Sequence, residues 1–308
     1  MKKNIIITIG DPAGCGPFIT LEAIKKLGAD FAFFLIVGDS YILERIPLYQ
    51  NLKNKITVID PKTQGIEKIR KGRASVLSGK ASLSYLKIAL DFIKKNSIKR
   101  LVTAPLSKEA VELNVPGFSG HTEYLAKYFK QKKIEMMMVS DKLKAVLFTR
   151  HIPLRGVSSC IRKDKLTDTF CLVRHGLSKM FKIKNPRVVV SSLNPHAGVN
   201  TFLEKEEKIV CAAIKASGAK IFGPYPSDTI FTSDNLKKYD CVICLYHDQA
   251  MIPFKLLSMK EGVNLTLGLP IIRTSPAHGT AFDIIREGKL PFSSSMVSAI
   301  KLAARLEI

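Results

Sequence analysis

The chain has 308 residues, 46% apolar and 24% charged; this composition excludes a disordered, collagen-like or coiled-coil protein, and the length predicts about two domains. Basic residues outnumber acidic residues by 48 to 26, a formal net charge of +22 that attracts polyanions. These basic residues are scattered in ones, twos and threes rather than gathered in runs, so we expect no nucleic-acid partner. The longest apolar run, Phe31 to Val37, is far short of the ~20 residues that cross a bilayer. We therefore expect a cytoplasmic protein with no membrane contact.

Short apolar runs that are typical of strands alternate with longer helical periods along the chain. Strands are expected over residues 4–9, 31–37, 55–59, 100–103, 135–139, 145–149, 187–191 and 241–246. Helices are expected over residues 16–27, 81–95, 122–128, 164–181, 203–216 and 294–306. Strands that are continuously apolar are usually covered by helices on both faces. The alternation therefore predicts an α/β fold with a largely parallel sheet.

The six cysteines do not predict a disulfide framework, because the chain is long and has no recognisable signal peptide. Cys241 and Cys244 have CxxC spacing, but both fall in an expected buried strand, so we interpret them as small apolar residues. The turn from Gly10 to Pro17 lacks both GxGxxG and GxxxxGK[ST]. Neither a Rossmann fingerprint nor a Walker A loop is therefore present.

Three histidines follow expected strands, each in a polar turn. His151 follows the strand at 145–149, His196 lies in the turn Asn194-Pro-His-Ala-Gly198, and His247 follows the strand at 241–246. Ligands of parallel α/β proteins bind beyond the carboxyl ends of the strands, and imidazoles bind zinc and other divalent ions. The pattern therefore favours a shared metal site, although a histidine at a strand end is more often a hydrogen-bonded turn residue. Asp228 and Asp248 lie nearby and are acidic candidates, or simple loop caps.

His121 and Thr122 stand at the expected start of a helix, after Gly120. Free N–H groups, the helix dipole and a threonine hydroxyl can together bind an anion there. The alternative is an ordinary helix cap.

Six segments in order resemble the 4-hydroxythreonine-4-phosphate dehydrogenase family of pyridoxal 5′-phosphate (vitamin B6) biosynthesis. They are Thr103-Ala-Pro-Leu-Ser-Lys108, Gly117-Phe-Ser-Gly-His-Thr-Glu123, Thr149-Arg-His-Ile-Pro-Leu154, Ser192-Leu-Asn-Pro-His-Ala-Gly198, Tyr246-His-Asp-Gln249 and Ser275-Pro-Ala-His-Gly-Thr-Ala281. The resemblance begins at Gly10 and covers nearly the whole chain. It implies NAD-dependent oxidation of 4-phosphohydroxy-L-threonine to a β-keto acid, which loses CO₂ to give 3-amino-2-oxopropyl phosphate.

The resemblance also implies a fold and a set of site residues. The fold would be two α/β/α domains with a cleft, similar to isocitrate and isopropylmalate dehydrogenases and not a Rossmann fold; we place the domains at 1–120 plus 268–308 and at 121–267. The metal ligands would be His151, His196 and His247, and the ion would be zinc, magnesium or cobalt. The substrate would be bound by His121, Thr122, Lys255, Asn264 and Arg273. The cofactor, NAD or NADP, would contact His278 and Gly279, and the proton acceptor would be Asp248 or a metal-bound water. Members of the family are homodimers with the site between subunits, which leaves open that His247 serves the partner chain.

Some residues depart from the family pattern. Cys15, Phe18 and Arg286 stand where the family generally has other residues, which bears on cofactor preference rather than on the reaction. The alternatives are a sister metal-dependent dehydrogenase for another phosphorylated hydroxy acid or a dihydrodiol, and a metal-dependent hydrolase that uses no NAD. A third alternative, suggested only by the net charge of +22, is a nucleic-acid-binding protein whose binding is weak and steeply salt-dependent.

Overall fold

The computed structural model describes residues 2–198 and 204–308. Two compact units account for this chain: residues 1–129 with 270–306 and 308 form unit 1, and residues 130–269 with 307 form unit 2. The expected boundaries at 120/121 and 267/268 remain a proposal; the compact units differ from them chiefly in the helix at His121–Tyr128, which lies in unit 1. Among the described helices, none is long and apolar enough to cross a membrane.

Unit 1 is built on a parallel sheet. Its strands lie in the order β3 (Thr57–Ile59), β2 (Phe33–Val37), β1 (Asn4–Thr8), β4 (Arg100–Thr103) and β11 (Ile272–Pro276). The central strand β1 is apolar and buried from Ile5 onward, as a strand covered on both faces should be. All five strands run the same way, so the turns that follow them meet at one edge of the sheet.

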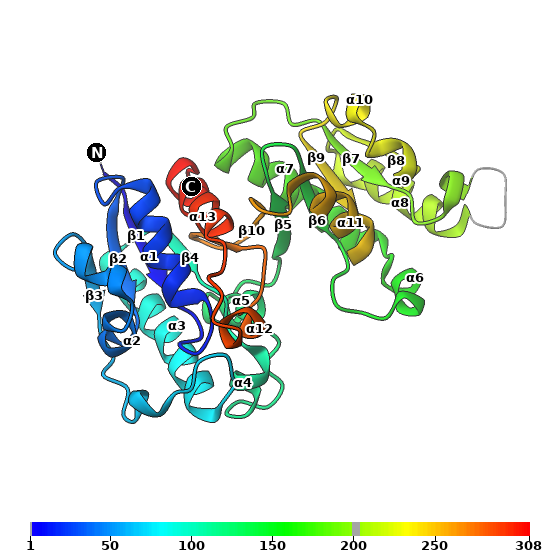
Figure 1. Ribbon diagram of the computed structural model, residues 1–308. Coiled ribbons are helices and arrows are strands. Elements are labelled where there is room, and N and C mark those ends of the chain that lie inside the picture. Colours follow the sequence, from blue (N-terminus) through cyan, green and yellow to red (C-terminus); the bar gives the residue numbers. More distant parts are fainter. Residues whose placement is uncertain (1, 199–203) are drawn as a thin grey trace. The chain divides into compact units, whose positions relative to one another are not determined.

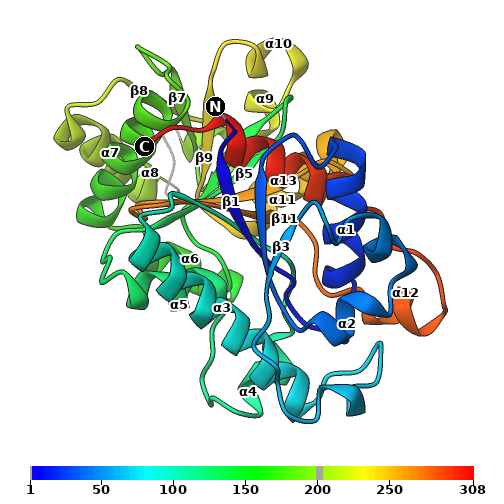
Figure 2. The same cartoon turned by 90° about the vertical axis from the view of Figure 1, so that its left-hand side faces the viewer.

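Helices cover both faces of this sheet. Figure 2 shows α1 (Gly16–Leu27) on one side of β1 and β3, and α3 (Val76–Asn96) on the other. The long helix α3 begins with a capping box, in which Ser75 and Ser78 each accept a hydrogen bond from the other's backbone N–H. The last helix, α13 (Ser294–Arg305), packs on α1, β4 and β11. Shorter helices of unit 1 are α2 (Ser40–Glu44), α4 (Lys108–Glu112), α5 (His121–Tyr128) and α12 (Phe282–Arg286).

Unit 2 has a mixed sheet. Its strands follow the order β10 (Val263–Leu267), β5 (Glu135–Val139), β6 (Lys144–Leu147), β9 (Cys241–Cys244), β7 (Val188–Ser191) and β8 (Ile221–Tyr225). The pairs β10–β5 and β5–β6 are antiparallel, whereas β6, β9, β7 and β8 are parallel. Helix α7 (Lys163–Met180) packs on α8 (Glu204–Ser217), and α11 (His247–Ser258) packs on β6 and β9 (Figure 1). The small helices are α6 (Val157–Cys160), α9 (Ser227–Ile230) and α10 (Ser233–Leu236).

The prediction of an α/β fold with a largely parallel sheet is confirmed. Every strand and helix expected above is present within a few residues of its expected bounds, although Leu203, where one helix was expected to begin, lies outside the described residues. Cys241 and Cys244 are both buried in β9, as expected. The prediction missed β8, β10, β11 and α11. The apolar pattern of β8 is interrupted by Gly223 and Pro224, and that of β11 is interrupted by Arg273 and Ser275. Helix α11 contains Pro253, a residue that usually ends or kinks a helix.

Candidate active site

The turns after β6 and β9 bring two of the expected histidines together in unit 2. The ring centroids of His151 and His247 lie 5.7 Å apart, with the ring planes inclined by 40°. Both residues line a cavity of about 310 Å³, together with Thr149, Arg150, Ile152, Leu154, Val157, Tyr246 and Asp248. The cavity opens at the carboxyl ends of two parallel strands, where ligands of α/β proteins bind.

The spacing of these two imidazoles suits one bound metal ion. Two histidines that each place a nitrogen about 2.0–2.1 Å from a tetrahedral zinc ion have ring centroids roughly 5 Å apart. The Asp248 carboxylate lies 2.6 Å from Nδ1 of His247, which leaves Nε2 of that ring for another ligand. A carboxylate in this position orients a metal-binding histidine.

His196 lies in a separate, tightly held turn after β7. His196 and Ala197 adopt left-handed backbone, each with φ of 55°, a conformation that is uncommon and strained outside glycine. The buried Glu207 carboxylate of α8 accepts hydrogen bonds from the backbone N–H groups of Leu193 and Asn194 and so anchors the start of this turn. Across residues 2–198 and 204–308, no three His, Cys, Asp or Glu side chains of one chain are placed to hold a metal ion together. The structure therefore joins His151 to His247 but does not join His196 to that pair.

Unit 1 contains a buried cation, Arg273 on β11. Its side chain is only 2% exposed, and its guanidinium donates from Nη2 and Nε to the Thr103 hydroxyl at 2.7 and 3.2 Å. Burial lowers the pKa of Arg273 to about 10, which still leaves the group charged at neutral pH. Burial, helped by the positive charges of Arg273 and Lys108, holds the pKa of His121 well below its usual value. A neutral imidazole thus lies within electrostatic reach of two cations, a combination that suits a phosphate or carboxylate.

The other expected substrate residues are placed as follows. Thr122 is 4% exposed in the first turn of α5, whose N-cap residue is Gly120, so its hydroxyl is not the helix cap. Lys255 is exposed near the end of α11. Asn264 lies on β10, and its buried Oδ1 has no hydrogen-bond partner within the described part of the chain. A buried acceptor without a partner is costly, and a bound ligand would relieve that cost.

The expected cofactor residues lie in the loop after β11. His278 is exposed, and its Nδ1 lies 2.9 Å from the Gly279 carbonyl oxygen. No heavy atom lies within 4 Å of a Cβ built on Gly279, so this stretch of backbone faces open space and is accessible to a ligand. The loop is braced by the turn after β1, where the Cys15 N–H donates to the Thr280 carbonyl at 2.9 Å. Cys15 is buried, which raises the pKa of its thiol to about 12 and keeps it un-ionised.

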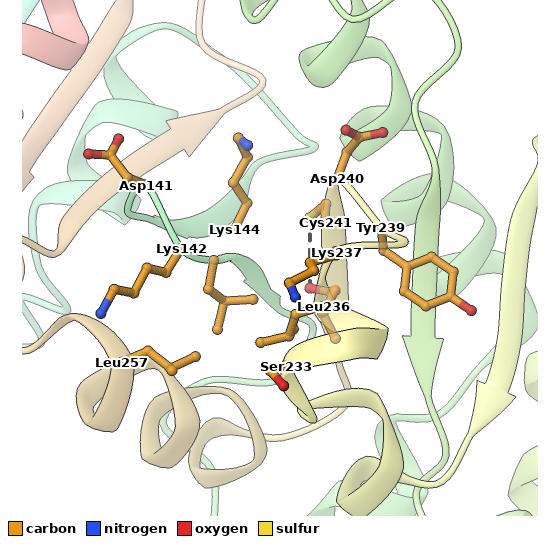
Figure 3. Close-up of a pocket in the computed structure, with 12 residues that line it drawn as sticks. Asp141, Lys142, Lys144, Ser233, Leu236, Lys237, Tyr239, Asp240, Cys241 and Leu257 are labelled. Carbon is orange, nitrogen blue, oxygen red and sulfur yellow. Dashed lines mark hydrogen bonds between the residues drawn. The ribbon is translucent and has the colours of Figure 1, made fainter.

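A larger cavity, of about 510 Å³, lies at the opposite ends of β6 and β9 (Figure 3). Its lining includes three lysines and two acids, Lys142, Lys144, Lys237, Asp141 and Asp240. It contains none of the residues expected for the site. Burial raises the pKa of its one thiol, Cys241, to about 12. We therefore place the candidate active site at the histidine end of the strands.

Sequence reasoning missed the residues that support the site. The Thr103 hydroxyl accepts a hydrogen bond from Arg273, and Glu207 anchors the turn of His196. The Gln249 side chain donates a hydrogen bond to the Ser192 carbonyl, which precedes the same turn. Thr103 and Gln249 both belong to segments that resemble the family, at Thr103–Lys108 and Tyr246–Gln249. Membership of these segments was the sequence signal that could have identified them.

Comparison with known proteins decides the family. The model of the family described as pyridoxal phosphate biosynthetic protein PdxA matches residues 30–303. The chain belongs to this family. It is 39% identical over 310 residues to 4-hydroxythreonine-4-phosphate dehydrogenase of Aquifex aeolicus, covering 96% of both chains. It is also 35% identical over 325 residues to D-threonate 4-phosphate dehydrogenase of Salmonella typhimurium, covering 99% of both.

A solved structure agrees with the sequence relatives. The solved structure of a putative 4-hydroxythreonine-4-phosphate dehydrogenase from Salmonella typhimurium superposes with a TM-score of 0.85 at 33% identity, covering 99% of both chains. The resemblance stated from the sequence motifs is confirmed by these matches. The PdxA relatives named here are dehydrogenases, so the protein is an oxidoreductase of that family.

Proposed function

We propose that this protein oxidises 4-phosphohydroxy-L-threonine with NAD⁺, giving 2-amino-3-oxo-4-phosphooxybutanoate, which loses CO₂ to form 3-amino-2-oxopropyl phosphate. This reaction serves pyridoxal 5′-phosphate biosynthesis, and we place it in the cytoplasm. The single observation that carries the proposal is the buried Arg273, held by Thr103 beside a neutral His121. A buried cation is kept at a cost, and binding a phosphorylated substrate would offset that cost.

The proposed substrate residues are His121, Thr122, Lys255, Asn264 and Arg273. Arg273 would bind two phosphate oxygens through its planar guanidinium, for which Lys is a poor replacement. His121 is neutral, so it can donate one hydrogen bond to the substrate without adding a third positive charge. Asn264 would satisfy its buried Oδ1 on the amine of the substrate.

A divalent ion, zinc, cobalt or magnesium, is proposed to be held by His151, His196 and His247. When bound, it would supply Lewis acidity toward the hydroxyl group that is oxidised. The two imidazoles at 5.7 Å suit such an ion, and the Asp248 carboxylate orients the His247 ring. We propose Asp248 also as the acceptor of the substrate hydroxyl proton, because it lines the same cavity as His151 and His247.

NAD⁺, or NADP⁺ in its place, is proposed to contact His278 and Gly279 in the loop after β11. The exposed backbone of Gly279 offers an approach that a larger residue would restrict. The Cys15–Thr280 backbone bond holds this loop against the first turn of unit 1.

We propose that the protein is a homodimer. The support is an apolar face on α11 and its C-cap residue, Met259, where Ile252, Leu256 and Met259 are 60%, 82% and 79% exposed. These residues share one helical face, and a stripe of this kind marks an interface. The same helix begins at His247, so a partner on this face would lie beside the proposed metal ligands.

The deciding experiment follows nicotinamide absorbance with 4-phosphohydroxy-L-threonine and NAD⁺, before and after metal chelation. We expect turnover that chelation abolishes and that zinc, cobalt or magnesium restores. D-threonate 4-phosphate should be assayed in parallel, because one relative is named for that substrate. Turnover of D-threonate 4-phosphate alone would replace the proposed substrate, and hydrolysis without change in nicotinamide absorbance would replace the reaction class.

A further inference from the structure

Gln249 is a buried amide at the meeting point of the strand ends in unit 2. It is 7% exposed and lies in the first turn of α11, two residues after His247. Its Oε1 accepts hydrogen bonds from the Leu245 N–H at 2.7 Å and from the Ser191 hydroxyl at 2.5 Å. Its Nε2 donates to the Ser192 carbonyl at 2.8 Å and to the Ser227 hydroxyl at 2.7 Å. These four bonds use the full capacity of a primary amide.

The partners of Gln249 lie at the bases of the histidine turns. Ser191 and Ser192 end β7 and lead into the turn of His196, while Leu245 follows β9 and leads into His247. The Leu245 carbonyl in turn accepts from the Thr149 hydroxyl at 2.6 Å and from the Thr149 N–H at 3.3 Å. Thr149 lies two residues before His151. A single side chain is thus bonded, directly or through Leu245, to the backbone that precedes each of the three histidines.

We propose that Gln249 is the positioning residue of this site: it sets the relative placement of the turns that carry His151, His196 and His247 without itself touching substrate. The proposal rests on the proposed function only in giving those histidines a shared role. The chemistry requires an amide, because the side chain must accept two hydrogen bonds and donate two. Glutamate lacks both donors, and methionine of similar length would leave the Leu245 N–H and the Ser192 carbonyl buried without that partner.

The test compares Gln249→Met with Ser140→Ala. Ser140 also makes several hydrogen bonds in unit 2, to Lys142, Leu143 and Ser258, but it lies in the β5–β6 turn, at the opposite end of β6 from His151. It therefore controls for the loss of side-chain hydrogen bonds in unit 2 as such. Ser227→Ala, which removes one of the four Gln249 bonds and leaves the other three, covers the case in which Gln249→Met fails to fold.

Two readouts separate positioning from general stability. The first is NMR of ¹³C-labelled histidine rings in the metal-free protein, with exposed His175 on α7 as internal reference. We expect the His151, His196 and His247 signals to move in Gln249→Met, and less so in Ser227→Ala, while His175 is unchanged. The second is Co²⁺ titration followed by visible absorption, in which Gln249→Met should bind at least ~10-fold more weakly and Ser140→Ala within ~3-fold of wild type.

Wild-type ring signals and Co²⁺ affinity in a folded Gln249→Met protein, or in Ser227→Ala if the first variant does not fold, would overturn the proposal. Equal changes in Ser140→Ala would overturn it too, since the effect would then be general. A wild-type protein that binds no Co²⁺ would instead overturn the metal part of the proposed function, and the ring signals would still decide the role of Gln249.

Discussion

The strength of the electrostatic interactions of Arg273 depends on its burial. Among the 48 basic residues of this chain, a surface lysine or arginine is screened and contributes little, whereas a guanidinium that is 2% exposed interacts strongly with whatever it faces. Arg273 is therefore not one more surface cation. The fixed fork of its guanidinium, carried by Thr103, is what a phosphate would recognise.

Arg273→Lys should therefore be costly although it keeps the charge. We expect kcat/KM for the phosphorylated substrate to fall at least ~10-fold, because the two parallel hydrogen bonds are lost. Affinity for NAD⁺ should be nearly unchanged. The matched control, Lys94→Gln with Lys95→Gln on the exposed end of α3, should change kcat/KM less than ~3-fold. Steady-state kinetics decide between them, and equal losses in both proteins would remove Arg273 from the phosphate site.

Asp11, in the first turn of unit 1, is a buried carboxyl group whose ionisation destabilises the folded protein. The side chain is fully buried after β1, where its Oδ1 accepts from the Ala13 N–H at 2.9 Å and the Ser78 hydroxyl donates to its Oδ2 at 3.4 Å. Burial outweighs these bonds and raises the pKa of Asp11 from 3.8 to about 6. The folded protein thus disfavours the ionised form, so the stabilising contribution of Asp11 is present below pH 4 and is lost as the pH rises through 6.

Asp11→Asn should remove this pH dependence. Between pH 4.5 and 7.5 the free energy of unfolding of the wild type should fall by roughly 2 kcal/mol relative to Asp11→Asn. The full shift of about two pKa units is worth ~3 kcal/mol, and part of it is already lost at pH 4.5. Urea denaturation at both pH values measures the difference. The exposed Asp141→Asn provides the control, and a wild type that tracks Asp11→Asn across this range would show that Asp11 is ionised without penalty.

Individual site residues could be predicted only when chemistry and position coincided. His151 and His247 were identified because each histidine follows an apolar strand, and the structure places their rings 5.7 Å apart. Thr103 and Gln249 were missed because the identity of a threonine or a glutamine does not indicate that its hydrogen-bond partners come from distant segments of the chain. The Gln249–Ser191 bond spans 58 positions and the Arg273–Thr103 bond 170, and contacts of that range depend on the fold.

At the scale of elements, hydrophobic periodicity predicted the helices and strands whose apolar residues are regularly spaced and buried. Helix α3 was expected because Leu83, Leu86, Ala89 or Leu90, and Ile93 recur on one face. All of these are buried except Leu83, which is half-buried. Strand β11 was missed because Arg273 and Ser275 interrupt its apolar pattern, yet every one of its residues is buried. Burial of Arg273 and Ser275 depends on partners from other segments, which the local apolar pattern does not show.

Helix α11 yields a prediction about assembly. Its exposed stripe of Ile252, Leu256 and Met259 would be covered in the proposed dimer, so Leu256→Glu should raise the dimer dissociation constant at least ~10-fold. Sedimentation velocity measures the shift toward monomer. Val76→Glu, at an apolar residue that is 55% exposed at the start of α3, should leave the dimer intact. A Leu256→Glu protein that sediments as wild type would place the interface elsewhere.

For the whole molecule, the net charge of +22 and the buried cation act on different partners. Scattered surface lysines attract any polyanion through screened forces, and such binding releases counterions and falls steeply with salt. Arg273 instead acts over a few ångströms inside unit 1, where screening by salt is weak. The two contributions can therefore be separated by ionic strength.

We expect duplex DNA of any sequence to bind weakly at 50 mM salt and to lose on the order of 100-fold in affinity by 200 mM, as a handful of phosphate contacts would. Over the same range the KM for the phosphorylated substrate should change less than ~3-fold, because its phosphate would meet a buried guanidinium rather than the surface charge. Fluorescence anisotropy and steady-state kinetics measure the two quantities. DNA binding that survives 200 mM salt or prefers one sequence would mean that the positive charge is organised for nucleic acid, and a KM that rises in step with DNA dissociation would mean that the substrate phosphate is bound at the surface.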